Sequence, residues 1–290
     1  MNNPPNKGYS IRIFLPDGTP DGLRIVEKSN WTGRGIVCPR SRFPEGKKRP
    51  EFKRTGVYIL TGPATEGEFP IVYIGEGDPA GVRLEQHHAK KDFWTSLILF
   101  TSKDENLNKA HGQYLESRLI ELADDAHRCT IENGNTPQLP SLSEADVAEM
   151  DSFLDEMRLI FPVIGLNVFE KPSVLPNEKH LLFLRAKGLI AKGYDSSQGF
   201  VVLKGSQASI ETAPSMAKYV KYMVTLRQTL LKKGILEKKD DYLVLTQDYS
   251  FNSPSTAAGV MMGRNANGRI EWKDKTGMTL KEIQAASVKG

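Results

Sequence analysis

The sequence predicts an α+β protein of two domains, and three observations support this prediction. At 290 residues, the chain is long enough for two cores, because single domains usually contain about 100 to 150 residues. Apolar residues alternate at strand spacing in some segments and recur at helical spacing in others. The proline-bearing stretch from Pro172 to Pro176 is the best linker. We therefore predict a first domain at 55–170 and a second domain at 178–290.

Residues 1–54 predict an N-terminal β-rich extension that ends in a basic loop. Apolar side chains alternate from Ile11 to Leu15, and a Pro-Asp-Gly turn follows at 16–18. The loop at 40–54 contains prolines and a glycine that favour an irregular path. Its seven basic residues are Arg40, Arg42, Lys47, Lys48, Arg49, Lys53 and Arg54. This loop is either a solvated connector or an arm that contacts nucleic acid.

Two short strands at about 56–60 and 70–75 are predicted to pair as an antiparallel hairpin. Alternation places Tyr58 and Tyr73 each on one face of its strand together with an apolar neighbour. The apolar run at 97–100 predicts a third strand. The first domain should therefore contain a small mixed sheet of about three strands, flanked by helices.

A helix should follow the second strand, with Asp78 as its capping residue and Pro79 at its first position. Arg83 and His87 then lie one turn apart on the same side of this helix. A second amphipathic helix at about 142–157 is expected to pack on the first domain.

The helix predicted at about 106–127 carries a carboxylate within its apolar face. At 100° per residue, Glu116 falls between Ile120 and Leu119, and Ala123 lies close to it. A carboxylate in such a position costs several kcal/mol unless it is paired or bound to metal. Glu116 is therefore either a metal ligand or the partner of a buried arginine.

The C-terminal residues predict a second α+β domain. A hairpin is expected at 193–204, a helix at about 215–233, a strand at 242–246, a helix after Ser253 and a strand near Trp272. This domain is basic and carries exposed candidates for phosphate contact at Lys232, Lys233, Lys238 and Lys239. Docking on nucleic acid and packing against a protein are both compatible with that composition.

Charge divides the chain into three parts. Residues 1–54 contain 12 basic residues (Lys and Arg) and 5 acidic residues (Asp and Glu). Residues 55–170 contain 8 basic and 20 acidic residues, and residues 171–290 contain 19 basic and 10 acidic residues. Basic flanks around an acidic centre fit a metal-holding core whose neighbours attract a polyanion, although such charges can also merely solvate a surface.

Membrane and disulfide-rich classes are not indicated. No run reaches the roughly 18 apolar residues of a membrane span, and the N-terminus lacks the apolar core of a signal peptide. We therefore expect a cytoplasmic protein with no membrane partner. Cys38 and Cys129 have no CxxC partner or clustered histidines, which predicts reduced, structural thiols.

Four short motifs in order resemble the GIY-YIG endonuclease family over about residues 55–135. They are Gly56-Val57-Tyr58, Tyr73-Ile74-Gly75, Val82 to His87 and Leu115 to Ile120. The C-terminal residues resemble an uncharacterised module that accompanies some GIY-YIG nucleases. The resemblance implies that Tyr58 and Tyr73 lie side by side and that Arg83 contacts the scissile phosphate. It also implies that Glu116 is the sole protein ligand of Mg²⁺ or Mn²⁺.

The expected activity is metal-dependent hydrolysis of phosphodiester bonds in DNA. Tyr58 or Tyr73 would act as the base if metal and arginine lower its pKa, and the sequence leaves open which of them does so. His87 and His111 are further candidates for positioning water or phosphate. For each of them, however, a surface or capping histidine is the favoured interpretation.

Two positions differ from the usual family pattern or are ambiguous. Glu76 stands where many members have a lysine, so that either the usual cationic contact is absent or another residue, such as Lys109, replaces it. The late family asparagine corresponds to Asn133 or Asn135, which a tight turn also explains.

Two alternatives remain beside the DNA nuclease. One is a catalytically weak or inactive adaptor that uses the nuclease fold to dock on nucleic acid, and Glu76 together with the acidic centre motivates it. The other is a nuclease that acts on RNA or on single strands. No protein partner is indicated by the sequence.

Overall fold

The computed structural model describes residues 8–64, 69–134, 137–170, 180–196 and 199–287. These residues form two compact units, the first made of 8–64 and 69–170 and the second of 180–287. The linker expected at Pro172 to Pro176 lies outside the described residues. None of the helices in the described part of the chain has the length and apolar character that a membrane span requires.

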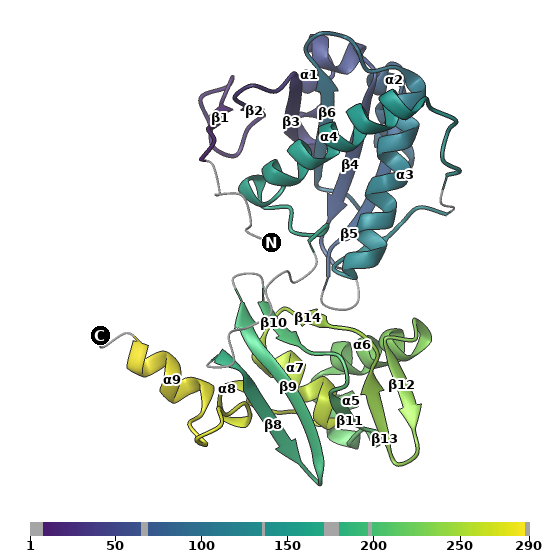
Figure 1. Ribbon diagram of the computed structural model, residues 1–290. Helices are drawn as coiled ribbons and strands as arrows, with labels where there is room; N and C mark the ends of the chain where they lie inside the picture. Colours follow the sequence, from purple (N-terminus) through teal and green to yellow (C-terminus); the bar gives the residue numbers. More distant parts are fainter. Residues whose placement is uncertain (1–7, 65–68, 135–136, 171–179, 197–198, 288–290) are drawn as a thin grey trace. The chain divides into compact units, whose positions relative to one another are not determined.

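The first unit is built on one sheet in which the described residues contribute seven strands (Figure 1). In spatial order they are β1 (Ile11–Phe14), β2 (Arg24–Lys28), β3 (Gly33–Pro39), β6 (Ser96–Ser102), β4 (Gly56–Gly62), β5 (Ile71–Gly77) and β7 (Thr130–Ile131). All neighbours are antiparallel except β5 and β7. The expected β4–β5 hairpin is present, with Tyr58 directly opposite Gly75.

The prediction of about three strands was wrong because the N-terminal residues join the same sheet. The full length of β3 pairs with β6, from Gly33 opposite Ser102 to Pro39 opposite Ser96. Residues 8–54 are therefore part of the first unit and not a separate extension. Local alternation predicted the strands but did not reveal that β6 needed a second partner.

Helices cover both faces of this sheet. They are η1 (Arg40–Arg42), α1 (Phe43–Gly46), η2 (Pro50–Lys53), α2 (Ala80–Lys90), α3 (Lys109–Ala126), α4 (Glu144–Ile160) and η3 (Pro162–Ile164). Asn108 caps α3 by accepting a hydrogen bond from the His111 amide, and Ser143 caps α4 in the same way. Helix α2 begins one residue later than expected, after Pro79, and has no side-chain cap.

Two apolar cores lie on opposite faces of the sheet because side chains alternate along each strand. Val57 and Ile59 of β4 face the core that α3 and α4 cover. Tyr58 and Leu60, the intervening residues, face the core formed with α1, η2 and α2. Tyr58 is therefore held on the α2 side of the sheet.

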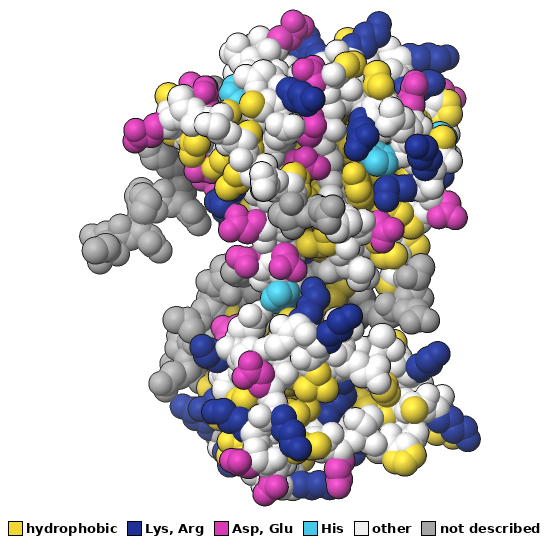
Figure 2. Space-filling model, turned by 90° about the vertical axis from the view of Figure 1, so that its right-hand side faces the viewer, with side chains coloured by type: hydrophobic (Ala, Val, Ile, Leu, Met, Phe, Trp, Pro, Cys, Tyr) yellow, Lys and Arg dark blue, Asp and Glu magenta, His cyan; other side chains and the backbone are white. Residues whose placement is uncertain are grey.

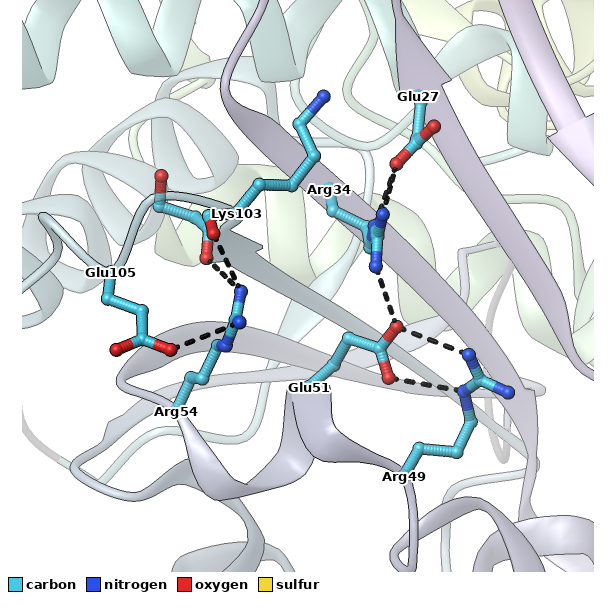
Figure 3. A network of polar contacts seen from close by, with 8 residues as sticks. Glu27, Arg34, Arg49, Glu51, Arg54, Lys103 and Glu105 are labelled. Atoms are coloured by element: carbon cyan, nitrogen blue, oxygen red, sulfur yellow. Dashed lines mark hydrogen bonds and ion pairs between the residues drawn. The ribbon is translucent and has the colours of Figure 1, made fainter.

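The basic loop is ordered, and much of its charge is used within the first unit (Figure 3). Glu51, only 1% exposed, receives hydrogen bonds from Arg34 and from both Nε and Nη2 of Arg49. Burial alone would raise the pKa of Glu51, but the arginine hydrogen bonds outweigh it and lower the pKa. Arg54 binds the carbonyls of Ser102 and Lys103. The prediction of an irregular loop was wrong because these cations hold its short helices against the sheet.

We predict that Glu51→Gln destabilises the first unit by about 1 to 3 kcal/mol, because two arginines lose their shared anion in a buried position. The arginine side chains are each 30% exposed, which keeps the cost below that of a fully buried pair. Urea unfolding measures it. Glu45→Gln is the matched control, since the exposed Arg42–Glu45 pair should contribute less than about 1 kcal/mol. Equal effects of the two variants would contradict the prediction.

The second unit contains two small antiparallel sheets and several helices (Figure 1). One sheet has the order β14 (Tyr249–Phe251), β10 (Gly199–Val202), β9 (Leu189–Ser196), β8 (Leu182–Ala186), and the other has the order β11 (Gln207–Ser209), β13 (Tyr242–Leu245), β12 (Leu236–Lys239). The helices are α5 (Pro214–Tyr219), α6 (Lys221–Lys232), α7 (Pro254–Met262), α8 (Gly268–Glu271) and α9 (Leu280–Ser287).

The second unit contains the expected hairpin, the strand at 242–245 and the helix after Ser253, together with β8, β11, β12, β14, α8 and α9, which were not predicted. Two expected elements differ in the structure. The helix expected at 215–233 is divided at Val220, whose φ of −140° and ψ of 51° are not helical. Trp272 is fully buried and belongs to no strand; its neighbour Lys273 instead forms isolated bridges with Phe183 and Thr279. The α+β class is confirmed for both units.

Candidate active site

The four motifs converge on one pocket of the first unit, with a volume of about 430 Å³. Tyr58 comes from β4, Tyr73 from β5, Arg83 from α2 and Glu116 from α3. Other residues that line it are Gly75, Glu76, Gly77, Asp78, Pro79, Val82 and Lys109. Residues separated by up to 58 positions in the chain therefore share one polar hollow.

The position of Tyr58 depends on the glycine opposite it. Tyr58 and Gly75 are cross-strand partners, and a Cβ atom on Gly75 would lie 2.5 Å from the Tyr58 hydroxyl oxygen. The missing side chain lets the phenol ring cross β5 and place its hydroxyl at the pocket. The hydroxyl is buried and has no hydrogen-bond partner among the described residues.

We predict that Gly75→Ala displaces the Tyr58 ring, destabilises the first unit by about 1 to 3 kcal/mol as an overpacked site and lowers any activity of this pocket. Thermal unfolding and a cleavage assay measure the two effects. Gly134→Ala is the control, because a Cβ atom there would meet nothing within 4 Å. A Gly75→Ala variant as stable as the control variant would contradict this packing.

Tyr73 lies beside Tyr58 in a cluster of rings and cations. The two phenol rings are stacked, with centroids 6.4 Å apart. The His87 ring lies 4.7 Å from the Tyr73 ring and 5.9 Å from the Tyr58 ring. The Lys91 ammonium lies 4.6 Å from the Tyr73 ring centroid, a contact that the sequence motifs did not reveal.

Burial dominates the ionisation of this cluster. It raises the pKa of both tyrosines, and the opposing charge of Arg83 does not reverse the direction. Both phenols are therefore protonated at neutral pH, contrary to the lowered pKa that a tyrosine base requires. Burial, aided by the charges of Arg83 and Lys91, lowers the pKa of His87 to about 4. His87 is therefore neutral, and its buried Nε2 atom has no partner among the described residues.

Glu116 presents an unpaired carboxylate to the pocket from the middle of α3. It is half-buried, and no described residue forms a hydrogen bond or an ion pair with it, so that the alternative of a buried arginine partner is not observed. Burial raises the pKa of Glu116 from 4.5 to about 7, the charge of Glu76 adds to this effect, and Arg83 opposes it.

Glu76 is the second carboxylate of the pocket and lies against the same helix. A Cβ atom on Gly112, one turn before Glu116, would approach the Glu76 Cβ atom to 3.3 Å and its Oε2 atom to 3.7 Å. The glycine therefore leaves room for the Glu76 side chain. Burial raises the pKa of Glu76 above its usual value, and the charge of Lys109 only partly opposes this effect. The Oε2 atom of Glu76 is buried without a partner among the described residues. Lys109, the cation that could replace the usual lysine, also lines the pocket.

We predict that Glu116→Gln stabilises the metal-free protein at about pH 8 but not at about pH 5. A carboxyl group whose pKa is higher in the folded state makes stability fall as pH rises from 4.5 through 7, because the folded state then loses a proton that it holds more tightly. The full shift corresponds to about 3 kcal/mol, and solvent screening reduces this to about 1 to 2 kcal/mol. Urea unfolding in EDTA at both pH values measures it. The exposed Glu149→Gln variant should show no such difference; a pH-independent effect of Glu116→Gln would contradict the account.

His111 does not belong to the pocket. Its Nδ1 atom lies 3.2 Å from the Asn106 carbonyl oxygen, and its Nε2 atom lies 3.3 Å from Asn108 Nδ2 and 3.7 Å from an Asp146 oxygen. His111 thus connects the start of α3 to α4, which fits the favoured capping interpretation and not the alternative of a residue that positions water or phosphate. Its place in the first turn of the helix was the signal for a capping role.

Asn133 supports the pocket from outside it. Its side-chain amide accepts a hydrogen bond from the Ile74 N–H at 3.0 Å and donates one to the Ile74 carbonyl at 2.7 Å. Strand β7 pairs with β5 only at Ile71 and Val72, so that Asn133 extends the pairing to the residue between Tyr73 and Gly75. Asn135, the other candidate for the late family asparagine, lies outside the described residues.

Asp78 is a pocket residue that the sequence assigned to a helix cap. Its carboxylate accepts a hydrogen bond from the Thr55 hydroxyl at 2.7 Å, which joins the start of β4 to the segment before α2. The Ala80 amide donates to the Arg54 carbonyl across the same junction. These contacts fix α2, and with it Arg83, beside the tyrosines.

Comparison with known families identifies the second unit alone. Residues 182–284 match the family described as a domain of unknown function (DUF4357). The match is compatible with the uncharacterised C-terminal module expected from the sequence. No match to the GIY-YIG family was found. No curated protein and no solved structure matches the chain.

The pocket residues are compatible with a hard divalent cation. Carboxylate oxygens are the ligands that Mg²⁺ prefers, and this ion usually takes one or two carboxylates together with water and phosphate oxygens. Glu116 and Glu76 offer two half-buried carboxylates, and the Oε2 atom of Glu76 lacks a partner among the described residues. No group of three or more His, Cys, Asp or Glu side chains in the described ranges is arranged to hold a metal.

Proposed function

We propose that the first unit is a metal-dependent endonuclease that hydrolyses phosphodiester bonds, with DNA as its expected substrate. The observation that carries this proposal is the meeting of Tyr58, Tyr73, Arg83 and Glu116, from four separate elements, in one pocket. Each of the four motifs alone is weak evidence. Residues that act together in one reaction must lie at one place, and these four come from separate segments of the chain and line the same pocket. The resemblance to the GIY-YIG family supports the same reading.

Glu116, with Glu76 beside it, would hold the divalent cation. When bound, Mg²⁺ or Mn²⁺ supplies Lewis-acid stabilisation of the phosphate oxygens and of the leaving 3′-oxygen. The two carboxylates give the pocket a negative charge that attracts a divalent cation before substrate arrives. Glu76, which stands where many family members have a lysine, would thus help to bind the cation in this chain.

Arg83 is suited to bind the scissile phosphate. It is exposed at the pocket, where its side chain forms a hydrogen bond with Tyr73 and donates one to Gln86 at 3.3 Å. A guanidinium offers several N–H donors in a planar fork that matches phosphate oxygens. Arg83 would bind the phosphate in the ground state and stabilise its additional charge in the transition state.

Tyr73 and His87 are suited to remove the proton from the attacking water. His87 is neutral at neutral pH and can accept a proton, whereas Tyr73 is protonated and less buried than Tyr58. We therefore assign removal of the water proton to this pair: Tyr73 lines the pocket, and His87, whose ring lies 4.7 Å from the Tyr73 ring, is the neutral acceptor beside it. Tyr58 would donate its free hydroxyl to the bound water or phosphate.

The alternative remains an adaptor that binds nucleic acid without cleaving it efficiently. The observation that favours it is the half-buried Glu76, which would repel phosphate if no cation neutralised it. The raised pKa values of both tyrosines also fit a weak catalyst.

A panel of single- and double-stranded DNA and RNA tests the proposal. The wild-type protein is incubated with each polymer in Mg²⁺ and in EDTA, and both cleavage and binding are measured. Cleavage that requires Mg²⁺ supports the nuclease and identifies its polymer, including the RNA or single-strand alternative. Binding without cleavage of any polymer would favour the adaptor.

A further inference from the structure

Helices α5 and α6 of the second unit form a stretch without any acidic residue. Residues 214–233 contain the basic residues Lys218, Lys221, Arg227, Lys232 and Lys233 and no Asp or Glu. Arg227 is buried and donates its hydrogen bonds to the backbone carbonyls of Val260, Ser209 and Ile210. Arg227 thus holds α6 in place, and the lysines supply the surface charge.

Two tyrosines are exposed at the junction of these helices. Tyr219, the last residue of α5, is 67% exposed, and Tyr222, in the first turn of α6, is 38% exposed. The opposite faces of the helices are fixed by buried Met216 and Met223. Neighbouring aromatic rings that are exposed together form an apolar surface of the kind that can mark an interaction site.

A lysine lies beside each of the two tyrosine rings. The Lys218 ammonium lies 5.1 Å from the centroid of the Tyr219 ring, and Lys221 is exposed next to Tyr222. We name Lys218, Tyr219, Lys221 and Tyr222 the tyrosine–lysine surface. Figure 2 shows dark blue lysine and arginine side chains at several places over the second unit, in the lower half of the view.

We propose that the tyrosine–lysine surface binds single-stranded nucleic acid by stacking bases on Tyr219 and Tyr222 and by pairing phosphates with Lys218 and Lys221. Proteins that bind single strands without sequence preference combine exposed aromatic rings with a positively charged path for the backbone. The absence of acidic residues from 214–233 removes local repulsion of phosphate. This inference rests on the proposed function in that the first unit would act on the same polymer, but binding itself needs no metal.

Single strands fit this surface better than a duplex does. Bases in a duplex are stacked on each other, so that their faces are closed to a tyrosine, whereas bases of a single strand can be splayed onto aromatic side chains. Lysines alone would serve both polymers through phosphate contacts. The tyrosines are therefore the part of the surface that selects single strands.

Fluorescence anisotropy with the full chain in EDTA tests the inference, because cleavage is then suppressed. Labelled single-stranded DNA, single-stranded RNA and duplex DNA of equal length are titrated at several salt concentrations. We expect tighter binding of the single strands, and a loss of at least about 30-fold in the double variant Tyr219→Ala and Tyr222→Ala, because stacking contributes about 1 to 3 kcal/mol per base. Lys218→Ala with Lys221→Ala should reduce the slope of log affinity against log salt by about 1.4, the value for two single-strand phosphates.

Two control variants separate stacking from other effects. Tyr219→Phe with Tyr222→Phe keeps both rings and should retain binding. Tyr9→Ala removes a tyrosine of the first unit that is 51% exposed and lies 5.4 Å from the Lys28 ammonium; it should leave binding unchanged.

Three results would overturn the inference: wild-type affinity in the folded double-alanine variant, equal losses in the alanine and Tyr9 variants, or absence of single-strand binding by the wild type. Circular dichroism verifies that each variant is folded. The proposed function fails separately, since Glu116→Gln should abolish cleavage in Mg²⁺ and leave binding in EDTA intact.

Discussion

Glu116→Gln should lower the rate constant of phosphodiester cleavage by at least about 1,000-fold in Mg²⁺. Glutamine keeps the size of the side chain but removes the negative charge that a hard cation prefers. The loss of one preorganised electrostatic group commonly costs about 10² to 10³ in rate, and the loss of the ion itself should exceed that. Single-turnover cleavage of a labelled oligonucleotide measures the rate constant directly.

Glu121→Gln serves as the control for this substitution. Glu121 lies on the same helix, is exposed, pairs with Arg118 at 2.6 Å and does not line the pocket. Its rate constant should match that of the wild type. Cleavage by Glu116→Gln within about tenfold of the wild type would mean that Glu116 does not hold the catalytic ion, since about 1.4 kcal/mol is too little for loss of a metal.

Arg83→Ala should lower the same rate constant by about 100- to 1,000-fold, because the transition state carries more negative charge on the phosphate than the ground state does. Arg83 is exposed, and its hydrogen bonds are with Gln86 and Tyr73, so that its removal should change stability by only about 1 kcal/mol. Single-turnover rates and urea unfolding of the same variant distinguish the two effects.

Arg83→Lys tests whether the planar fork or the charge matters. A lysine supplies one point charge in place of two parallel donors, and an intermediate rate constant is expected. The neighbouring Glu85→Gln variant, which removes an exposed partner of Lys47, should leave the rate unchanged. A wild-type rate in Arg83→Ala would exclude Arg83 from phosphate binding.

Much of the fold could be predicted from local patterns. The alternation in β4 and β5 and the helical period around Glu116 predicted those elements with their correct faces, because the spacing of apolar residues reflects burial directly. The seven-strand sheet could not be predicted in the same way. Pairing of β3 with β6 joins residues about 60 positions apart, and no local pattern specifies such a partner.

The sequence predicted the site residues that belong to a motif. It did not predict the contacts that depend only on how the elements pack. The pairing of the two tyrosine strands was predicted, but the register that places Tyr58 opposite Gly75 was not. The direction of the tyrosine pKa shifts could not be predicted either, because the burial of Tyr58 depends on α1, η2 and α2 together. The contact of Lys91 with Tyr73 also depends on where α2 ends in space.

The basic loop shows the limit of composition. Seven basic residues within 15 positions suggested either a connector or a nucleic-acid arm. In the structure, Arg40 donates to the carbonyls of Lys91, Trp94 and His88, and Arg49 pairs with the buried Glu51. Charge counts cannot distinguish a cation that binds a ligand from one that binds the protein's own backbone.

Chelation followed by return of metal tests the central claim most directly. The wild type and Glu116→Gln are treated with EDTA, transferred to metal-free buffer and assayed for single-turnover cleavage before and after addition of Mg²⁺ or Mn²⁺. The account predicts that the wild type loses cleavage on chelation and regains it with either ion, while the folded variant regains none. Cleavage by the chelated wild type, or equal recovery in both proteins, would contradict a metal-dependent nuclease centred on Glu116.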